Sequence, residues 1–242
     1  MDGDLTKRIP GVRELCRRAQ ALTVVERAHL AGRLSSAPWA FVVGGLRLDG
    51  SSLLDVGCGP GLLAFLLERR GYAGTYLGVD PDGRKVARAR AWLKESERRS
   101  FRAVGVEAVE ERGFDQAAIV DVLYLVPPPA RAALVAEVAS RLAPGGRLVV
   151  LTSGGGPRWK RSVDRIQERL AVAVLGFTHG EVVAPCDGAE VASLFTQAGL
   201  LDVRVEDAGA GYVHGFELVT GRRGDAGASA RGPGREGSSR RS

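Results

Sequence analysis

The sequence predicts an α/β fold of the doubly wound, Rossmann-like type, with a mostly parallel sheet whose last strand is antiparallel. From residue 51 onward, segments with the pattern of strands alternate with segments with the pattern of helices, as in parallel sheets with helical crossovers. Residues 117–120 and 148–151 are continuously apolar, as expected for strands buried on both faces. The first strand candidate ends in glycines, and in such sheets this place holds ligands.

The N-terminal residues precede this alternation and predict a helical cap. Residues 11–34 carry apolar side chains at helical spacing, with Arg and Glu between them, which predicts one helix. Residues 35–38 include Ser and Pro and break the pattern. A second short apolar segment, residues 39–43, ends at two glycines. We therefore expect residues 1–45 to form an N-terminal helical cap.

The rest of the chain provides seven strand candidates and five further helix candidates. The strands are expected at residues 52–56, 75–79, 101–106, 115–124, 146–152, 201–206 and 213–219. The helices are expected at residues 61–70, 82–98, 129–142, 158–175 and 187–198. Only residues 207–212 separate the last two strand candidates. That connection is too short for a helical crossover, so these two strands should pair antiparallel.

Composition divides the chain into a folded part and a tail. Of the 242 residues, 45% are hydrophobic, so a sizeable core is expected in a domain at residues 46–220 with an insertion at 154–190. Residues 221–242 are mostly Gly, Arg, Ser and Ala and are expected to form a disordered basic tail, because they can bury little apolar surface. This tail holds six arginines against two carboxylates and so carries four of the six net positive charges. The remainder is nearly neutral, which disfavours a dedicated nucleic-acid binder.

The cysteines and the N-terminus predict the compartment. Cys16, Cys58 and Cys186 are far apart and form no CxxC pair, so neither a disulfide framework nor a metal site is indicated. The chain begins without the apolar stretch of a signal peptide, and no run reaches the roughly 18 apolar residues of a spanning helix. We expect a cytoplasmic protein with no metal and no membrane span, and the oligomeric state stays open.

The glycine-rich segment predicts the type of cofactor. Residues 53–61 read Leu-Leu-Asp-Val-Gly-Cys-Gly-Pro-Gly, and glycine allows both a sharp turn and the close approach of a ligand. A dinucleotide fingerprint, GxGxxG, would need glycine where the chain has Leu62. S-adenosylmethionine (SAM) carries a sulfonium and an ammonium group instead of a pyrophosphate. The buried carboxylate expected at Asp55 suits those charges, because burial without a partner would be costly.

An acid at the end of the second strand candidate supports a nucleoside cofactor. Asp80 ends the apolar run that starts at Tyr76 and is followed by Pro81. An acid about 20 residues past the glycines is placed to accept hydrogen bonds from ribose hydroxyls. Asp80 would otherwise serve as a cap for the following helix. The glycine turn and the acid together predict a cofactor of the nucleoside type.

These residues resemble the class I SAM-dependent methyltransferase family over residues 50–152. The matching motifs are the loop at 55–61, the acid turn at 78–81, Phe114-Asp115 at the fourth strand, and Pro144-Gly145-Gly146 before the fifth. The resemblance implies a seven-stranded sheet with an antiparallel seventh strand, and SAM as the cofactor. It also implies that Gly57, Gly59 and Gly61 approach the methionine part of SAM and that Asp80 holds the ribose. Cys58 and Pro81 lie within these two loops and complete the set expected to contact the cofactor there.

The chain departs from the family after the third strand. The family often has an acid there, near the adenine amino group, and this chain has Val106 with Glu107 beside it. Backbone groups around Glu107 and Ala108 are therefore expected to contact adenine. Asp121, an acid in an otherwise apolar strand, is expected to lie near the cofactor or to order a neighbouring loop.

The acceptor side of the site gives fewer signals. Methyl transfer from a sulfonium is an in-line displacement that positioning can accelerate greatly, so no fixed catalytic set is required. Tyr124 is a candidate for the acceptor pocket, and packing at the edge of the sheet is an equally good explanation. Residues 126–129 lack the polar first residue and the aromatic of the enzymes that methylate exocyclic amines. Cys186 follows a proline but lies too far downstream for cytosine-C5 chemistry, so a structural role is expected.

The insertion at residues 154–190 leads to the hypothesis of a lid. It begins with Gly-Gly-Gly-Pro, a flexible joint, and a helix packed on the sheet is the alternative. In the lid hypothesis, Trp159 and Phe177 line an apolar acceptor pocket. His179 is the candidate general base, and Tyr124 is the other catalytic candidate.

The sequence thus predicts a SAM-dependent methyltransferase that acts on a small, partly apolar metabolite. The alternative enzyme is an RNA or protein methyltransferase guided by the basic tail and by the pairs Lys7-Arg8 and Arg17-Arg18. A catalytically inactive SAM-binding protein is the alternative outside enzymes, because a fold does not by itself imply a function.

Overall fold

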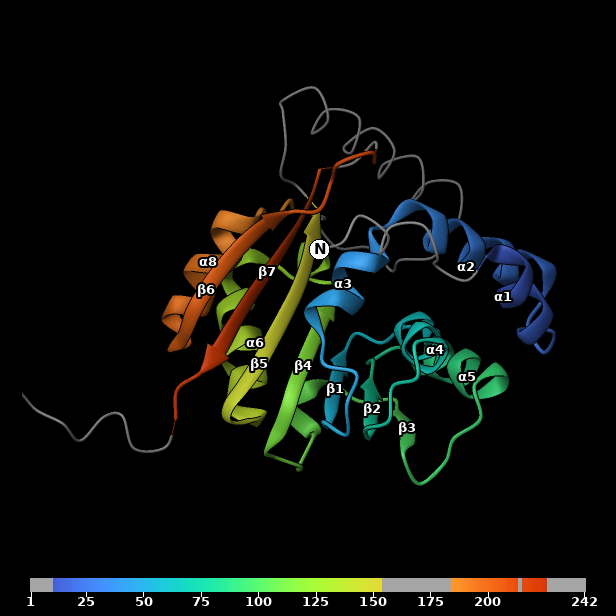
Figure 1. Cartoon of the computed structure of the whole chain (residues 1–242), viewed down its shortest axis with the longest axis horizontal. Helices are drawn as coiled ribbons and strands as arrows, with labels where there is room; N and C mark the ends of the chain where they lie inside the picture. The colour runs from blue at the N-terminus through green and yellow to red at the C-terminus, as the bar shows by residue number, and fades with distance from the viewer. Residues whose placement is uncertain (1–10, 154–183, 213–214, 226–242) are drawn as a thin grey trace, which may run out of the picture.

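The computed structural model describes residues 11–153, 184–212 and 215–225 and contains a seven-stranded sheet in the order β3-β2-β1-β4-β5-β7-β6 (Figure 1). The strands are β1 (Leu53–Val56), β2 (Tyr76–Val79), β3 (Arg99–Arg102), β4 (Phe114–Val120), β5 (Leu142–Ser153), β6 (Leu200–Asp207) and β7 (Phe216–Arg223). Strands β1 to β5 pair parallel, whereas β7 pairs antiparallel with both β5 and β6. The predicted doubly wound sheet with an antiparallel last strand is confirmed.

Two apolar cores lie on the two faces of the sheet. Leu53 and Val149 belong to the core shared with α3, α4 and α5, and Leu54 and Val150 belong to the core shared with α6 and α8. Neighbouring residues of a strand point to opposite faces, so each apolar strand contributes to both cores. Figure 1 shows α6 and α8 behind the half of the sheet formed by β5, β7 and β6. The covering helices are α3 (Trp39–Gly45), α4 (Leu62–Arg69), α5 (Gly83–Trp92), α6 (Pro128–Arg141) and α8 (Gly188–Gln197).

The N-terminal cap differs from its prediction in one respect. Residues 11–34 do not form one helix, because α1 (Val12–Arg18) ends before α2 (Val24–Ser36) begins. Thr23 and Glu26 form a capping box, in which the Glu26 amide donates to the Thr23 hydroxyl at 3.3 Å and the Thr23 amide donates to the Glu26 carboxylate at 2.9 Å. Such a box satisfies amides that the first helical turn leaves without partners, so the chain starts a new helix there.

Several strand ends also lie elsewhere than predicted. β3 ends at Arg102, and residues Val106–Ala108 form a short 3₁₀ helix, η2, instead of continuing the strand. β4 ends at Val120, because the next residue, Asp121, has a positive φ of 57°. β7 continues to Arg223, so residues 221–223 belong to the sheet and not to the expected tail.

Parts of the predicted insertion and tail lie outside the described residues. These parts include the predicted helix at 158–175 and residues 226–242. Within the described ranges, no helix has both the length and the apolar character needed to cross a membrane.

Candidate active site at the carboxyl ends of the strands

The glycine turn follows β1 at the carboxyl edge of the sheet. Gly57, Gly59 and Gly61 all have positive φ angles, of 75°, 53° and 86°. A Cβ atom at Gly57 would collide with Val122, and one at Gly61 would come within 2.5 Å of Leu93, whereas one at Gly59 would meet nothing within 4 Å. The outer two glycines are therefore required by packing. Gly59 alone of the three borders open space, where a ligand can approach the backbone.

The Asp80 carboxylate holds this turn in place. Asp80 follows β2 and is only 5% exposed. One carboxylate oxygen accepts from the Gly59 amide at 3.0 Å, and the other accepts from the Asp82 amide at 2.9 Å. Each oxygen of a carboxylate has room for two hydrogen bonds, so one position on each oxygen is left for a ligand hydroxyl. Asp80 is thus built into the turn and also suited to bind a ribose diol. Asp80 was alternatively considered as the cap of the following helix, but the residue that caps α5 is Asp82.

Asp55 lies below the turn and has a partner that the sequence analysis missed. Its carboxylate is 2% exposed and accepts a hydrogen bond from the Tyr76 hydroxyl. Burial raises the pKa of Asp55 to about 7, against the opposing effect of that hydrogen bond, and the nearby charge of Asp80 adds to the rise. The register places Asp55 opposite Gly78, two residues after Tyr76, which explains the diagonal contact. A cationic ligand group at this edge would favour the ionised form of Asp55.

Both buried cysteines near the site have a packing role. The Cys58 side chain lies over Gly78, where an added Cβ would come within 3.0 Å of its sulfur. Burial raises the pKa of the Cys58 thiol, and it raises the pKa of Cys186 to about 11. Because the thiolate is the reactive form, neither is suited to act as a nucleophile, in agreement with the structural role expected for Cys186.

The segment after β3 adopts a compact turn. Val106 is 3% exposed and belongs to the core, so the position that the family often fills with an acid faces inward here. The Ala108 amide donates to the Gly105 carbonyl at 3.2 Å, and the Glu107 carbonyl accepts from Arg141 at 3.4 Å. Contact of Glu107 and Ala108 with adenine stays a prediction.

Asp121 ties the N-terminal cap to the carboxyl edge of the sheet. Its carboxylate forms an ion pair with Arg33 of α2 at 2.5 Å and accepts from the Ser153 hydroxyl at 3.3 Å. α2 makes a second link farther along, where Arg88 of α5 donates to Glu26 at 2.5 Å. Asp121 was expected to lie near the cofactor or to order a neighbouring loop, and its ion-pair partner Arg33 belongs to a helix, α2. Contact of Asp121 with the cofactor stays a prediction. α2 therefore spans the edge from the end of β4 to α5.

His29 lies on the same side of α2 as these links. It is four residues before Arg33 and three after Glu26, and such residues share a helix face. Burial lowers the pKa of His29 below its ordinary value, and the positive charges of Arg33 and Arg88 lower it further. Its side chain keeps an exposed surface. A neutral imidazole is therefore available at this edge near pH 7.

A buried arginine that the sequence analysis also missed connects the loop after β4 with the segment before α8. Arg131 of α6 is 1% exposed. It donates to the carbonyls of four residues in the two loops beside the site and to the Glu190 carboxylate at 2.7 Å. The four carbonyls belong to Leu123, Val126, Ala184 and Pro185. The loop after β4, which carries Tyr124, is thereby fixed against the segment that precedes α8.

Of the four residues predicted to lie on the acceptor side, the structure describes Tyr124. Tyr124 is half-buried, and its carbonyl accepts from the Ala184 amide at 3.1 Å. Trp159, Phe177 and His179 lie outside the described residues. The lid hypothesis and the role of His179 therefore stay predictions.

Together, these residues fit SAM at the ends of β1 and β2. Gly59 borders open space, and Asp80 retains acceptor positions. Among the described residues, the Asp55 carboxylate has a neutral hydroxyl as its partner and no cation. A nucleoside with a positively charged end matches this combination. The strand order with an antiparallel β7, combined with glycine and acid turns after β1 and β2, defines the class I SAM-dependent methyltransferases. This chain belongs to the family described as a methyltransferase domain, whose model matches residues 28–205.

Curated relatives of this chain include proteins named ubiquinone biosynthesis O-methyltransferase. The chain is 34% identical over 139 residues to the ubiquinone biosynthesis O-methyltransferase of Xanthomonas campestris pv. campestris strain B100, covering 56% of this chain and 53% of that protein. It is 40% identical over 108 residues to the enzyme of the same name from Xylella fastidiosa strain 9a5c, covering 43% of each chain. The chain thus spans about half the length of the curated relatives it matches.

Solved structures share the fold at lower identity. The pyocyanin biosynthetic protein PhzM superposes with a TM-score of 0.66 at 19% identity, covering 88% of this chain and 62% of that one. Magnesium protoporphyrin IX methyltransferase from Synechocystis PCC 6803, solved with bound SAM, gives a TM-score of 0.54 at 16% identity, covering 92% and 86%. These likenesses establish the fold of the chain.

Proposed function

We propose that this chain transfers the methyl group of SAM to a hydroxyl of a small, partly apolar metabolite. The observation that carries the proposal is the joint placement of Gly59, Asp80 and Asp55 at one edge of the sheet, with α2 spanning the same edge. The names of the curated relatives, which are ubiquinone biosynthesis O-methyltransferases, support oxygen as the acceptor atom. The near-neutral folded part supports a small acceptor.

The residues of the chain bind and orient the two reactants. When bound, SAM supplies a methyl carbon already activated by its sulfonium. Asp80 accepts hydrogen bonds from the ribose, and Asp55 faces the positively charged end through the glycine turn. Arg33 and Asp121 hold α2 across the edge, so that the acceptor is confined beside the donor. Such positioning supplies a large part of the acceleration of a displacement reaction.

A hydroxyl acceptor must also lose its proton, and His29 is the described side chain best placed to take it. It lies one helical turn from Arg33, keeps an exposed surface, and has a pKa lowered below its ordinary value. It is therefore neutral and able to accept a proton at pH 7. Tyr124, in the loop fixed by Arg131, would line the acceptor pocket opposite α2.

The test is methyl transfer by the purified full chain. Labelled SAM is incubated with catechols and hydroquinones that carry alkyl chains of increasing length, and in parallel with total RNA and with protein extract. Label in the phenols, increasing with the alkyl chain, is the expected result. Label in RNA or protein only would overturn the small-molecule proposal and favour the alternative that the basic tail suggests.

A binding measurement separates loss of chemistry from loss of the cofactor site. The same fold can serve more than one reaction, because a fold does not by itself imply a function. Calorimetric titration with S-adenosylhomocysteine should show one site per chain. Binding without label in any fraction would overturn methyl transfer and favour an inactive SAM-binding protein.

A further inference from the structure

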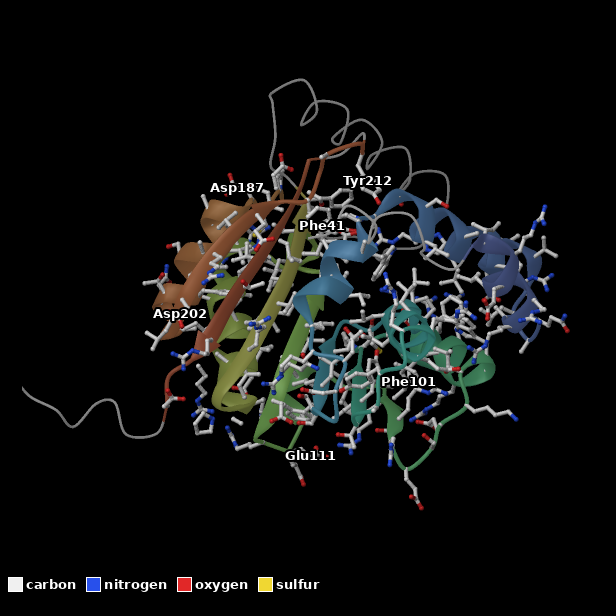
Figure 2. The ribbon with its side chains drawn as sticks, in the orientation of Figure 1. Phe41, Phe101, Glu111, Asp187, Asp202 and Tyr212 are labelled. Atoms are coloured by element: carbon white, nitrogen blue, oxygen red, sulfur yellow. The ribbon has the colours of Figure 1, made fainter. Side chains whose placement is uncertain are left out.

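A cavity lies on the sheet face that carries α3, away from the candidate cofactor site. It has a volume of about 660 Å³ and is bounded by α3 and by the strands β5, β7 and β6. Figure 2 labels two of its lining residues, Phe41 on α3 and Asp202 on β6. Cavities of about 300–1,000 Å³ are the size that small-molecule sites have. Its volume therefore suits a small ligand.

The cavity carries an excess of positive charge. Four arginines line it against two carboxylates. Arg147 of β5 is the direct cross-strand partner of Arg222 on β7, and Arg204 of β6 stands opposite Thr220, two residues away from Arg222. Like charges directly opposite each other destabilise a sheet. The three adjacent strands β5, β7 and β6 each place an arginine in the lining of this one cavity. The other charged lining residues are Arg47, Asp202 and Glu206.

The arginines differ in how far their charge is neutralised. Arg222 donates to Asp202 at 3.0 Å and to Asp225 at 3.2 Å. Arg147 donates to a neutral acceptor, the Gly45 carbonyl, at 3.0 Å. In the described part of the chain, Arg204 has no hydrogen-bonded or ion-paired partner among the side chains or carbonyls. Guanidinium groups bind carboxylates and phosphates in a forked geometry, so Arg147 and Arg204 are available for an anion.

The opposite part of the lining is mainly apolar, although Glu206 of β6 stands opposite Leu218 there. Phe41 and Ala40 of α3 and Leu218 of β7 contribute to it. Leu218 lies opposite Leu151 in the register with β5, four residues along from the position of Arg147. Because a strand advances about 3.3 Å per residue, the apolar and the basic ends of the cavity are separated by about 13 Å. A ligand that used both ends would have an anionic head and an apolar body.

The position of this cavity makes it distinct from the cofactor edge. Arg147 lies six residues before Ser153 on β5, and Ser153 contacts Asp121 at the cofactor edge. Six residues of strand correspond to about 20 Å. We propose that the cavity is a second binding site for a small organic anion, whose carboxylate or phosphate contacts Arg147 and Arg204 and whose apolar body packs on Phe41 and Leu218. This site is independent of methyl transfer.

Calorimetric titration of the full chain with phenyl phosphate tests the proposal. Phenyl phosphate should bind one site per chain, inorganic phosphate should bind more weakly because it lacks the ring, and phenol should not bind. Arg204→Gln should weaken phenyl phosphate binding about tenfold, the effect of one charge-assisted hydrogen bond. Phe41→Ala should weaken phenyl phosphate and leave inorganic phosphate unchanged.

Two controls decide whether such binding belongs to this cavity. Arg13→Gln removes the same charge from an exposed residue of α1. The affinity of this variant for phenyl phosphate should equal that of the unaltered chain. Saturation with S-adenosylhomocysteine should leave phenyl phosphate binding unchanged, which keeps the outcome separate from that of the proposed methyl transfer. An Arg204→Gln variant that binds as tightly as Arg13→Gln, displacement by S-adenosylhomocysteine, or no binding of phenyl phosphate would each overturn the proposal.

Discussion

The guanidinium of Arg131 on α6 donates a hydrogen bond to the carboxylate of Glu190 on α8 at 2.7 Å. Its remaining N–H groups donate to carbonyls in residues 123–126 and 184–185. One buried side chain therefore connects two helices and the two loops that flank the acceptor side. The packing of α6 on α8 and the positions of both loops depend on the same residue.

Replacement of Arg131 by Met should destabilise the protein strongly. The apolar side chain leaves four carbonyls and the Glu190 carboxylate without their donor, and each buried acceptor left without a partner costs about 1–3 kcal/mol. Urea denaturation followed by circular dichroism measures the free energy of unfolding. Arg13→Met, on an exposed residue, is the matched control and should change that free energy by less than about 0.5 kcal/mol. A loss at Arg131→Met no larger than the control's would contradict this role.

The ligand-free protein should lose stability between pH 4 and pH 7 through Asp55. Its pKa is raised to about 7 in the folded protein, whereas an unfolded chain has a value of about 3.9. Between these values the unfolded state has already lost the proton that the folded state keeps. The free energy of unfolding therefore falls by up to about 1.4 kcal/mol for each unit by which the pH rises. Above pH 7 the contribution is flat.

Urea denaturation of the unaltered chain and of Asp55→Asn, from pH 4.5 to pH 8.5, measures this difference. The Asn variant should lack the slope, because its amide does not ionise. Tyr76→Phe removes the hydrogen bond that lowers the pKa of Asp55 and should extend the slope above pH 7. Parallel curves for the unaltered chain and Asp55→Asn would show that the Asp55 carboxyl ionises normally.

Gly59→Ala should weaken cofactor binding more than it weakens the fold. The new methyl group meets no protein atom within 4 Å and projects into the space assigned to the cofactor. The positive φ costs about 1 kcal/mol. Gly113→Ala is a matched control, since Gly113 also has a positive φ and open space around it. Both variants should unfold at similar urea concentrations, and only Gly59→Ala should lose affinity for S-adenosylhomocysteine. Equal affinities would contradict the assignment of Gly59.

Asp80→Asn should reduce S-adenosylhomocysteine affinity at least about tenfold, the effect of one lost charge-assisted hydrogen bond. In the Asn variant an NH₂ group, which donates, replaces one of the two carboxylate oxygens, which accept. Either a ribose hydroxyl or one of the backbone amides that Asp80 binds therefore loses its acceptor. Calorimetry gives the affinity, and thermal unfolding gives the accompanying loss of stability. Asp187→Asn changes the cap of α8 and should leave the affinity unchanged. The Asp80 prediction fails if its variant binds as Asp187→Asn does.

His29→Gln should lower kcat for a phenolic acceptor at least about tenfold, because general base catalysis contributes 10²–10⁴-fold. The KM for SAM should stay unchanged, since His29 takes part in no cofactor contact proposed above. Val24→Gln provides a control on the same helix, because Val24 is 71% exposed and is neither three nor four residues from His29. Steady-state rates for the two variants make the comparison, and unchanged turnover in His29→Gln would remove His29 as the base.

The glycine turn and the acid turn show how far local sequence can specify a site. Gly57, Gly59 and Gly61 were recognisable because positive φ angles and close packing favour glycine. The edge of the sheet followed from strand order, since the carboxyl ends of parallel strands meet there. Sequence patterns did not reveal that packing requires Gly57 and Gly61 while only Gly59 borders open space, because that distinction depends on Val122 and Leu93.

The N-terminal cap shows the limit of periodicity. Apolar spacing predicted helix at residues 11–34, and the chain is helical there except at the break before Thr23. The capping signal of Thr23 and Glu26 was present in the sequence and could have located that break. The packing position of α2 could not be predicted from the sequence, because its ion pair between Arg33 and Asp121 joins residues 88 positions apart.

By itself, the sequence determined the class of fold, the antiparallel last strand and the position of the cofactor loops. Those features depend on short-range patterns, namely apolar runs, glycine turns and a connection too short for a helix. Only the tertiary structure decided the partner of Asp55, the central place of Arg131 and the cavity lined by Arg147 and Arg204. Each of these depends on side chains from separate strands or helices that meet only when the sheet has formed. Burial then sets the pKa of Asp55 and the cost of removing Arg131.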